Sequence, residues 1–315
     1  MYPWRVDSQW SVKTMLAFAR QKLAAQQTPS PHLEAEVLLA HVLDCPRLAL
    51  LADPNRPLLA GELARYHELL DRRLGGEPVA YLVGGKEFWS LWLGIDHRVL
   101  IPRADTETLV EVALRHLRAH CNPSPRIVDV GTGSGAVAIA LAREIRGAFV
   151  IATDSSADAL AVARRNVDRH GLGSRIALVR ADLVRPFATN GSGSDSGNGN
   201  GNGSGSGSGR GHEPHVDLVV SNPPYVPTGE LPTLPLSVSR EPRQALDGGT
   251  DGLDVIRRLV PAAAALLRTG GALAIEHGWE QGASVVEVFR QAGFADASTT
   301  RDLGGRDRVT SGCRA

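Results

Sequence analysis

The sequence predicts an α/β protein in which a small all-helical N-terminal domain precedes a largely parallel, doubly wound sheet. Up to Leu74, apolar residues recur with the 3.6-residue period of a helix. Beyond Pro102, short apolar strands alternate with helical segments, which is typical of a parallel sheet covered on both faces. The chain has 315 residues, 43% of them hydrophobic, enough for two cores of unequal size.

The helical domain is expected over residues 1–85. Two helices are expected at about 12–27 and 32–44, separated by proline-containing turns. A third helix ends at Gly75 and Gly76, and its apolar stripe consists of Leu59, Leu63, Tyr66, Leu70 and Leu74.

Residues 86–101 and 102–315 are expected to form a hairpin hinge and the sheet domain. The hinge sequence, KEFWSLWLGIDHRVLI, mixes aromatic and β-branched residues around a glycine. In the sheet domain, strands are expected at 126–130, 149–154, 175–180, 216–221 and 272–277, with two terminal strands near 297–301 and 308–310. The helices between them are expected to reach about residues 146 and 170 and to span about 282–292.

A low-complexity tract occupies residues 190–211, between the third and fourth strands. It contains ten Gly, six Ser and four Asn, so it cannot bury enough apolar surface to offset the entropy of ordering it. We expect a disordered insertion there and assign it no role.

Charge and cysteine content exclude several classes of protein. Lys plus Arg and Asp plus Glu each number 34, so no overall basic field would attract nucleic acid or an anionic membrane. Cys45, Cys121 and Cys313 are odd in number and far apart, which indicates free thiols in a reducing cytosol and no metal site. Residues 1–10 contain no long apolar run, so we expect neither signal peptide nor anchor and a cytoplasmic location.

A glycine-rich loop follows the strand at 126–130. Gly131, Thr132, Gly133, Ser134 and Gly135 lead directly into an apolar helix, and the glycines let the backbone turn tightly and approach a ligand closely. Three glycines alone are a weak signal, because dinucleotide oxidoreductases share them. Asp129 before the loop gives the pattern D-x-G-x-G-x-G, which differs from the dinucleotide fingerprint.

Two carboxylates complete the predicted cofactor site. Asp154 ends the next strand, 21 positions after Gly133, where it can accept both ribose hydroxyls, although a helix N-cap is an alternative role. Asp182 can accept the adenine amino group, with Leu183 against the ring. S-adenosylmethionine has no phosphates and therefore suits such a loop better than a dinucleotide does.

The tetrapeptide Asn222-Pro223-Pro224-Tyr225 follows the strand at 216–221. The Asn222 side chain and the Pro223 main chain offer carbonyl oxygens to the two N–H groups of a planar nitrogen, and the prolines hold the turn rigid. Tyr225 offers an aromatic face to a flat amide or base. Asn222 would also border the cofactor. The alternative is that this tetrapeptide is an ordinary tight turn without a role in a site.

Together these residues resemble the release factor glutamine methyltransferases, also known as PrmC or HemK. The resemblance extends to Arg72–Tyr81, Gly85–Phe88, Leu100–Glu107, Glu241–Leu246, Glu276–Gly278 and Asp307–Thr310. The segment that ends I-P-R-x-x-T-E looks specific to this family, whereas N-P-P-Y also occurs in DNA amino-methyltransferases. Relatives often carry an aromatic residue at position 183, and the Gly/Ser/Asn tract is not a family feature.

The resemblance implies a Rossmann-like, class I methyltransferase domain that uses S-adenosylmethionine and an N-terminal domain that helps to dock the substrate. That substrate would be the Gly-Gly-Gln glutamine of peptide chain release factors 1 and 2, which act in translation termination. We expect a monomeric enzyme that does not bind nucleic acid directly. Two alternatives stay open: a DNA or RNA amino-methyltransferase acting on a flipped base, and a cofactor-binding protein without catalysis. Arg103 and Glu107 could orient the hinge, touch the substrate or form salt bridges, and His277 could simply pack.

Overall fold

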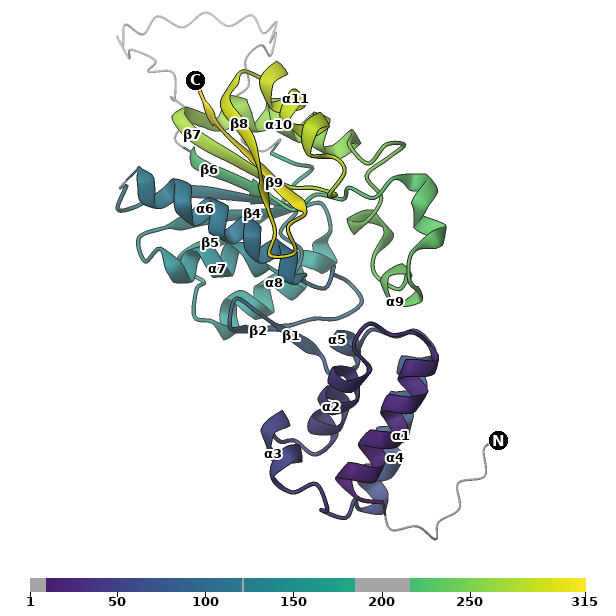
Figure 1. Cartoon of the computed structure of the whole chain (residues 1–315). Helices are drawn as coiled ribbons and strands as arrows, with labels where there is room; N and C mark the ends of the chain where they lie inside the picture. The colour runs from purple at the N-terminus through teal and green to yellow at the C-terminus, as the bar shows by residue number, and fades with distance from the viewer. Residues whose placement is uncertain (1–9, 121, 185–215) are drawn as a thin grey trace, which may run out of the picture.

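The computed structural model describes residues 10–120, 122–184 and 216–315. The Gly/Ser/Asn tract at 190–211 lies outside the described residues, so its predicted disorder stays a prediction. Figure 1 shows a helical part and a sheet-containing part, joined by a short hairpin. No helix in the described ranges is long and apolar enough to cross a membrane.

The helical part consists of five helices: α1 (Val12–Ala25), α2 (Pro31–Val42), α3 (Arg47–Ala52), α4 (Ala60–Leu74) and α5 (Val79–Leu82). The predicted helices at 12–27, 32–44 and up to Leu74 are confirmed as α1, α2 and α4. Helices α3 and α5 are too short for their periodicity to be recognised in the sequence. The fully buried Tyr66 of α4 donates its hydroxyl hydrogen to the Ala35 carbonyl, 3.1 Å away, and so joins α4 to α2.

A seven-stranded sheet forms the centre of the other part. Its strands are β3 (Arg126–Val130), β4 (Phe149–Asp154), β5 (Ile176–Arg180), β6 (Val216–Ser221), β7 (Leu267–Glu276), β8 (Phe294–Arg301) and β9 (Asp307–Arg314). The spatial order is β5-β4-β3-β6-β7-β9-β8, and β9 runs in the opposite direction to the other six strands. This topology confirms the predicted α/β class.

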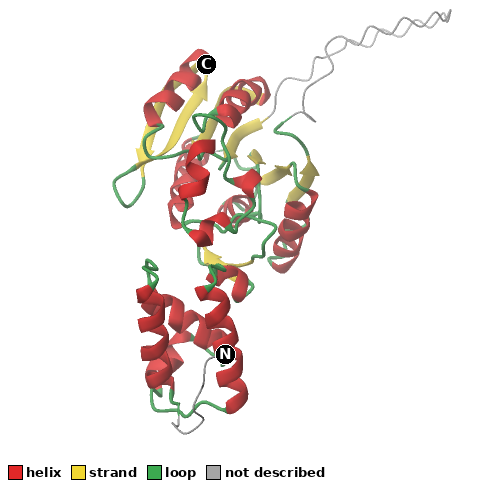
Figure 2. Ribbon diagram, turned by 90° about the vertical axis from the view of Figure 1, so that its right-hand side faces the viewer, coloured by secondary structure: helices red, strands yellow, loops and turns green. Residues whose placement is uncertain are grey.

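Helices cover both faces of the sheet (Figures 1 and 2). One face carries α6 (Glu107–Ala119), α7 (Ala136–Glu144) and α8 (Ala157–Arg169), and the other carries α10 (Asp254–Leu266) and α11 (Gly282–Gln291). The side chains of successive strand residues point to opposite faces of the sheet. Ile127 packs against α6, α7 and α8, and Val128 packs against α10 and α11. Helices α6 and α10 go beyond the predicted elements, and α10 contains Pro261, which interrupts the usual helical pattern.

The predicted hinge contains a hairpin of β1 (Gly85–Phe88) and β2 (Leu91–Gly94), after which residues 95–101 continue as turns and loop. Its turn residues, Trp89 and Ser90, both have positive φ, 53° and 55°, although neither is glycine. Glu107 stabilises this turn by accepting a hydrogen bond from the Trp89 main-chain N–H at 3.0 Å.

The sheet-containing part also contains short elements: η1 (Ala104–Thr106), η3 (Thr228–Thr233), α9 (Leu236–Ser239) and η4 (Arg243–Ala245). The segment around α9 reaches the loop after α4, where Arg240 donates a hydrogen bond to the Gly75 carbonyl at 3.2 Å. Leu236 packs so closely on Gly76 that a Cβ there would lie 2.3 Å from the leucine Cγ. The two parts therefore meet at two places, the hinge and this loop.

Asn166 of α8 connects the hinge to the glycine-rich loop. Its side-chain oxygen accepts the Gly94 N–H at 2.7 Å, and its nitrogen donates to the carbonyls of Gly94 and Ser134 at 3.0 and 2.8 Å. The side chain is 1% exposed, so water cannot replace these partners. One buried amide thus holds two segments that are far apart in the sequence.

We expect Asn166→Leu to lower the free energy of unfolding by about 2–4 kcal/mol, because one buried and two partly buried main-chain groups lose their partner. Urea denaturation followed by circular dichroism would measure the change. Arg164→Ala, an exposed change on the same helix, should stay within about 0.5 kcal/mol. An unchanged urea midpoint for Asn166→Leu would show that the bridge does not stabilise the fold.

Candidate active site

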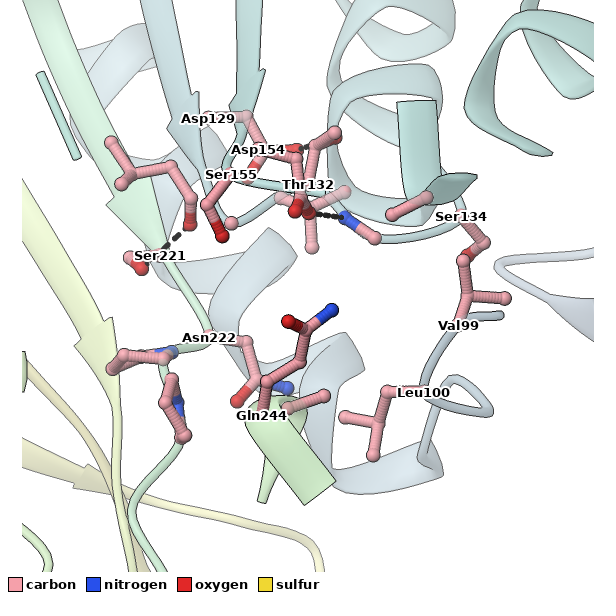
Figure 3. A pocket seen from close by; sticks show the side chains of 18 of the residues that line it. Val99, Leu100, Asp129, Thr132, Ser134, Asp154, Ser155, Ser221, Asn222 and Gln244 are labelled. Carbon is pink, nitrogen blue, oxygen red and sulfur yellow. Dashed lines mark hydrogen bonds between the residues drawn. The ribbon is translucent and has the colours of Figure 1, made fainter. Parts of the chain in front are cut away.

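The glycine-rich loop and the Asn222 turn meet at one cavity of about 280 Å³ (Figure 3). The loop follows β3 and the turn follows β6, and these strands are parallel neighbours in which Val130 pairs with Ser221. Their carboxyl ends therefore lie at the same edge of the sheet, where open α/β folds bind ligands. The sequence-predicted residues that line the cavity are Gly131, Thr132, Gly133, Ser134, Asp154, Asp182, Leu183, Asn222, Pro223 and Pro224. Gly135 and Tyr225 are not among them.

The three glycines of the loop have two different roles. All have positive φ, 72° at Gly131, 56° at Gly133 and 83° at Gly135. A Cβ on Gly131 or Gly133 would meet nothing within 4 Å, so these two residues border open space. A Cβ on Gly135 would lie 3.3 Å from Ile139 Cδ1, so this glycine lets the loop pack on α7.

Asp129 holds the loop from inside the protein. Its carboxylate accepts hydrogen bonds from the Thr132 hydroxyl at 2.6 Å and from the Ala138 N–H at 3.2 Å. Burial raises the pKa of Asp129 to about 6, while these two donors act in the opposite direction. The D-x-G-x-G-x-G pattern therefore has a structural reason: its first residue ties the loop to the helix that follows.

Asp154 faces the loop from the end of β4. Its Oδ2 accepts the Gly133 N–H and its Oδ1 accepts the Ser156 N–H, each at 2.9 Å. Burial raises the pKa of this carboxyl, and the main-chain donors lower it. The N-cap of α8 is Ser156, whose hydroxyl accepts the Ala159 N–H at 3.1 Å. Each Asp154 oxygen retains capacity for a further donor, since a carboxylate oxygen accepts about two hydrogen bonds.

Asp182 and Leu183 border the cavity beyond Asp154. The Asp182 carboxylate is half-exposed and forms an ion pair with Arg258 at 2.7 Å. Leu183 has a positive φ of 57°, and its carbonyl accepts a hydrogen bond from the Thr153 hydroxyl at 3.2 Å. The chain thus presents an apolar side chain beside an acceptor, as predicted for an adenine subsite, and the assignment of that subsite stays a prediction.

The Asn222 turn forms the opposite wall of the cavity (Figure 3). The Asn222 side-chain nitrogen donates to the Thr106 hydroxyl oxygen at 3.2 Å, which leaves the amide oxygen for an incoming donor. Among the described residues, none donates a hydrogen bond to the Pro223 carbonyl. Two acceptors are therefore held on a turn that has few donors of its own.

Tyr225 lies behind the turn. Its hydroxyl donates to Glu276 Oε1 at 3.3 Å, and its carbonyl accepts a hydrogen bond from Gln281 at 3.0 Å. Burial raises the pKa of its phenol well above the ordinary value. In this arrangement Tyr225 anchors the turn, so contact between its ring and a substrate stays a prediction.

Thr106 and Gln244 line the cavity but are absent from the residues predicted for the site. Figure 3 shows the Gln244 side chain pointing into the cavity from the side of the Asn222 turn. Thr106 belongs to the I-P-R-x-x-T-E segment, which was noted as part of the family resemblance. Its contact with Asn222 depends on the fold and could not be predicted from that segment. Glu276 lies behind the turn, and the sequence singled it out only as part of the segment Glu276–Gly278 that contributes to the family resemblance.

The residues whose roles were left open have structural partners. Arg103 forms an ion pair with Glu241, whose other oxygen accepts the Ile101 N–H at 2.9 Å. This arrangement corresponds to the salt-bridge alternative. His277 is fully buried, with its ring nitrogens 2.8 Å from the Gly278 carbonyl and 2.9 Å from the Thr310 hydroxyl. Burial lowers its pKa, which favours a neutral, packed imidazole.

The described ranges contain no group of three or more His, Cys, Asp or Glu side chains placed to hold a metal ion.

Comparisons with known proteins show to which family the chain is related. The sequence profile of the PrmC N-terminal domain matches residues 14–84, and a methyltransferase domain profile matches residues 127–192. The release factor glutamine methyltransferase of Moorella thermoacetica (strain ATCC 39073 / JCM 9320) is 42% identical over 299 residues, which are 95% of this chain and 96% of that protein. The protein of the same name from Geobacter sulfurreducens (strain ATCC 51573 / DSM 12127 / PCA) is 38% identical over 304 residues, 96% of each chain.

Among solved structures, the hMettl16 catalytic domain in complex with MAT2A 3′UTR hairpin 6 has a TM-score of 0.53 at 14% identity, over 79% of this chain and 82% of that chain. This similarity shows a shared fold. The two relatives exceed 35% identity over nearly their whole length, and both parts of the chain match the corresponding profiles. The chain therefore belongs to the family of release factor glutamine methyltransferases.

Proposed function

We propose that this enzyme transfers a methyl group from S-adenosylmethionine to the side-chain nitrogen of the Gly-Gly-Gln glutamine in peptide chain release factors 1 and 2. One observation carries the proposal: the Asn222 turn, whose amide oxygen accepts no hydrogen bond from the described residues, faces the glycine-rich loop across a single cavity. Both relatives described above bear the name release factor glutamine methyltransferase, which supports a release factor glutamine as the substrate.

The cavity residues fit S-adenosylmethionine. Gly131 and Gly133 leave open space at the loop, Asp154 offers acceptors to ribose hydroxyls, and Leu183 offers an apolar surface beside Asp182 for adenine. The volume of about 280 Å³ is close to the lower limit of ordinary ligand pockets, roughly 300 Å³. When bound, the cofactor supplies an electrophilic methyl group on a positively charged sulfur.

The protein then has to orient a weak nucleophile. An amide nitrogen shares its lone pair with the carbonyl, so it reacts only when held in line with the methyl carbon. Asn222 and Pro223 would accept the two N–H hydrogens of the glutamine amide and fix its plane. As the nitrogen gains the methyl group it loses one proton to solvent. Orientation of this kind can supply roughly 7–11 kcal/mol of the barrier reduction.

The remaining assignments rest on the same proposal. We assign residues 1–85 to substrate docking, 86–101 to the hinge and 102–315 to methyl transfer. We further propose that the enzyme acts as a monomer. Because the proposed substrate acts on the ribosome, we infer a cytoplasmic enzyme.

The proposed substrate can be tested with labelled S-adenosylmethionine, offered with either purified release factor or nucleic acid. We expect label on the release factor alone, as a 14-dalton increment on the tryptic peptide that contains Gly-Gly-Gln. Label on DNA or RNA and none on the release factor would favour the amino-methyltransferase alternative.

Asn222→Ala removes the acceptor that orients the amide, so we expect kcat/KM to fall by about 100-fold or more. Asn122→Ala is a matched control, because Asn122 contacts Asp217 at the opposite edge of the sheet. Steady-state methylation of a release factor would compare the two variants. Equal rates for Asn222→Ala and the unaltered enzyme would remove Asn222 from the mechanism.

Asp154→Asn removes the charge that would attract two ribose hydroxyls, and we expect the cofactor Kd to rise by about 10- to 100-fold, since hydrogen bonds to a charged group contribute about 1.5–3 kcal/mol. Isothermal titration calorimetry measures this directly. Asp182→Asn, at a half-exposed carboxylate, should have a smaller effect. A larger rise in the cofactor Kd for Asp182→Asn than for Asp154→Asn would place the ribose subsite at Asp182 instead.

A further inference from the structure

We propose that Gln244 is a substrate-binding residue: its side-chain amide binds the main chain of the Gly-Gly segment beside the methylated glutamine, through one accepted and one donated hydrogen bond. This role deepens the proposed function, on which it rests for the identity of the substrate. It gives a function to a cavity residue that was not among those predicted for the site.

Gln244 brings an unused amide group into the cavity. It lines the cavity together with Asn222, and Figure 3 shows its side chain pointing inward from the side of the Asn222 turn. Within the described ranges, no group of the protein forms a hydrogen bond with its side-chain oxygen or nitrogen. The neighbouring Arg243, by contrast, lies outside the cavity lining and forms an ion pair with Asp247 at 3.1 Å. The amide of Gln244 is therefore available to a molecule that enters the cavity.

The backbone that carries Gln244 is held on both sides. Before η4, the buried Glu241 carboxylate accepts a hydrogen bond from the Ile101 N–H at 2.9 Å. After η4, the carbonyl of the buried Leu246 accepts a hydrogen bond from the Val226 N–H, also at 2.9 Å. The Gln244 side chain therefore starts from a fixed backbone position, and such preorganisation reduces the entropy that binding a ligand costs.

The chain after η4 also packs on the Asn222 turn itself. Gly248 donates its N–H to the Val226 carbonyl at 2.8 Å. A Cβ on Gly248 would lie 2.8 Å from the Pro224 carbonyl oxygen, which is too close for any side chain. Gln244 and the acceptors of the turn therefore belong to one packed unit, whereas the glycine-rich loop forms the opposite wall of the cavity. This placement favours the substrate over the cofactor as the molecule that Gln244 binds.

An amide suits this place because of the chemistry of the proposed substrate. Neither glycine of Gly-Gly-Gln has a side chain, so a site can recognise them only through their main-chain N–H and C=O groups. A glutamine amide has both N–H donors and an acceptor oxygen. It can therefore accept from one N–H of the segment and donate to one C=O, while Asn222 and Pro223 hold the carboxamide. A carboxylate at the position of Gln244 could only accept, and an ammonium group could only donate.

The first test compares full-length Gln244→Met with the unaltered enzyme on a full-length release factor. Methionine keeps the length of the side chain but has neither the donor nor the acceptor of an amide. Because two neutral hydrogen bonds are lost, the KM for the release factor should rise by roughly 5- to 150-fold, while kcat stays within about threefold. The Kd of S-adenosylmethionine, measured by isothermal titration calorimetry, should stay within about twofold.

Gln291→Met is the matched control for this change. Gln291 is an exposed glutamine of α11 that lies outside the cavity lining, and its amide donates to Glu287 at 3.1 Å. Its replacement should leave both kinetic constants unchanged. Thermal unfolding of Gln244→Met should match that of the unaltered enzyme, because the exposed Gln244 side chain has no hydrogen-bond partner among the described residues.

The second test changes the atom that Gln244 would contact. Two release factors are made, each with glycolic acid in place of one glycine of Gly-Gly-Gln, so that an ester oxygen replaces one main-chain N–H. With the unaltered enzyme, one of them should show a KM higher by roughly 2- to 12-fold. With Gln244→Met, the same ester should have a much smaller effect, because both changes remove the same hydrogen bond.

Each contrary outcome removes a specific assignment. An unchanged release-factor KM for Gln244→Met would overturn the role of Gln244. A weaker cofactor Kd together with an unchanged release-factor KM would assign its amide to S-adenosylmethionine instead. Ester effects of equal size in both enzymes would show that Gln244 does not bind a glycine N–H. In all these cases the unaltered enzyme still methylates the release factor, whereas the loss of that reaction itself would contradict the proposed function.

Discussion

The lateral pairing of β3 with β6 is the constraint on which the active site depends. The two strands are far apart in the sequence, yet their parallel register places Val130 opposite Ser221, and the buried Ser221 hydroxyl donates to the Val130 carbonyl at 2.7 Å. The loop and the turn that follow these strands must therefore leave the sheet side by side. A shift of one residue would turn the preceding side chains to the opposite face and misalign both walls of the cavity.

Buried polar groups then hold each wall from behind. Asp129 fixes the glycine-rich loop to α7, Asp154 joins the same loop to the start of α8, and Glu276 supports the Asn222 turn. Burial raises the pKa of all three carboxyls. Desolvating these groups costs free energy. Each of them, however, orders main chain beside the cavity, where small displacements would affect the rate of a reaction.

The sequence predicted elements well wherever local pattern and tertiary structure agree. Strands β3, β4 and β6 have the predicted bounds, because each is a short run of mainly apolar residues. Strand β7 begins five residues earlier than predicted, at Leu267 instead of Ala272. Its first half contains Gly270 with a φ of 75°, and its pairing with β6 shifts register there. Glycines in a strand conceal it from pattern-based prediction.

The candidate site was predictable to the extent that its residues belong to local motifs. The loop, Asp154 and the Asn222 turn were found in this way, and the structure brings them to one cavity. Tyr225 shows the limit: its type suggested a platform for the substrate, whereas its hydroxyl reaches Glu276, 51 positions along the chain. Thr106 and Asn222 are 116 positions apart. Such contacts depend on the order of strands in the sheet, which the sequence of either segment does not contain.

Residues 86–101 connect the helical part to the cavity through specific contacts. Three of these residues, Arg98 to Leu100, line the cavity, and Lys86 of β1 donates to the Pro102 carbonyl at 2.7 Å. Arg103 and the Ile101 N–H both bind Glu241, which precedes the segment that carries Gln244. Asn166 joins the end of β2 to the glycine-rich loop. Because hinge residues form part of the cavity wall, a movement of the helical part relative to the sheet would alter the shape of the site itself. The proposed docking of a protein substrate on the helical part would therefore be coupled to the shape of the cavity through a few hydrogen bonds, most of them partly buried.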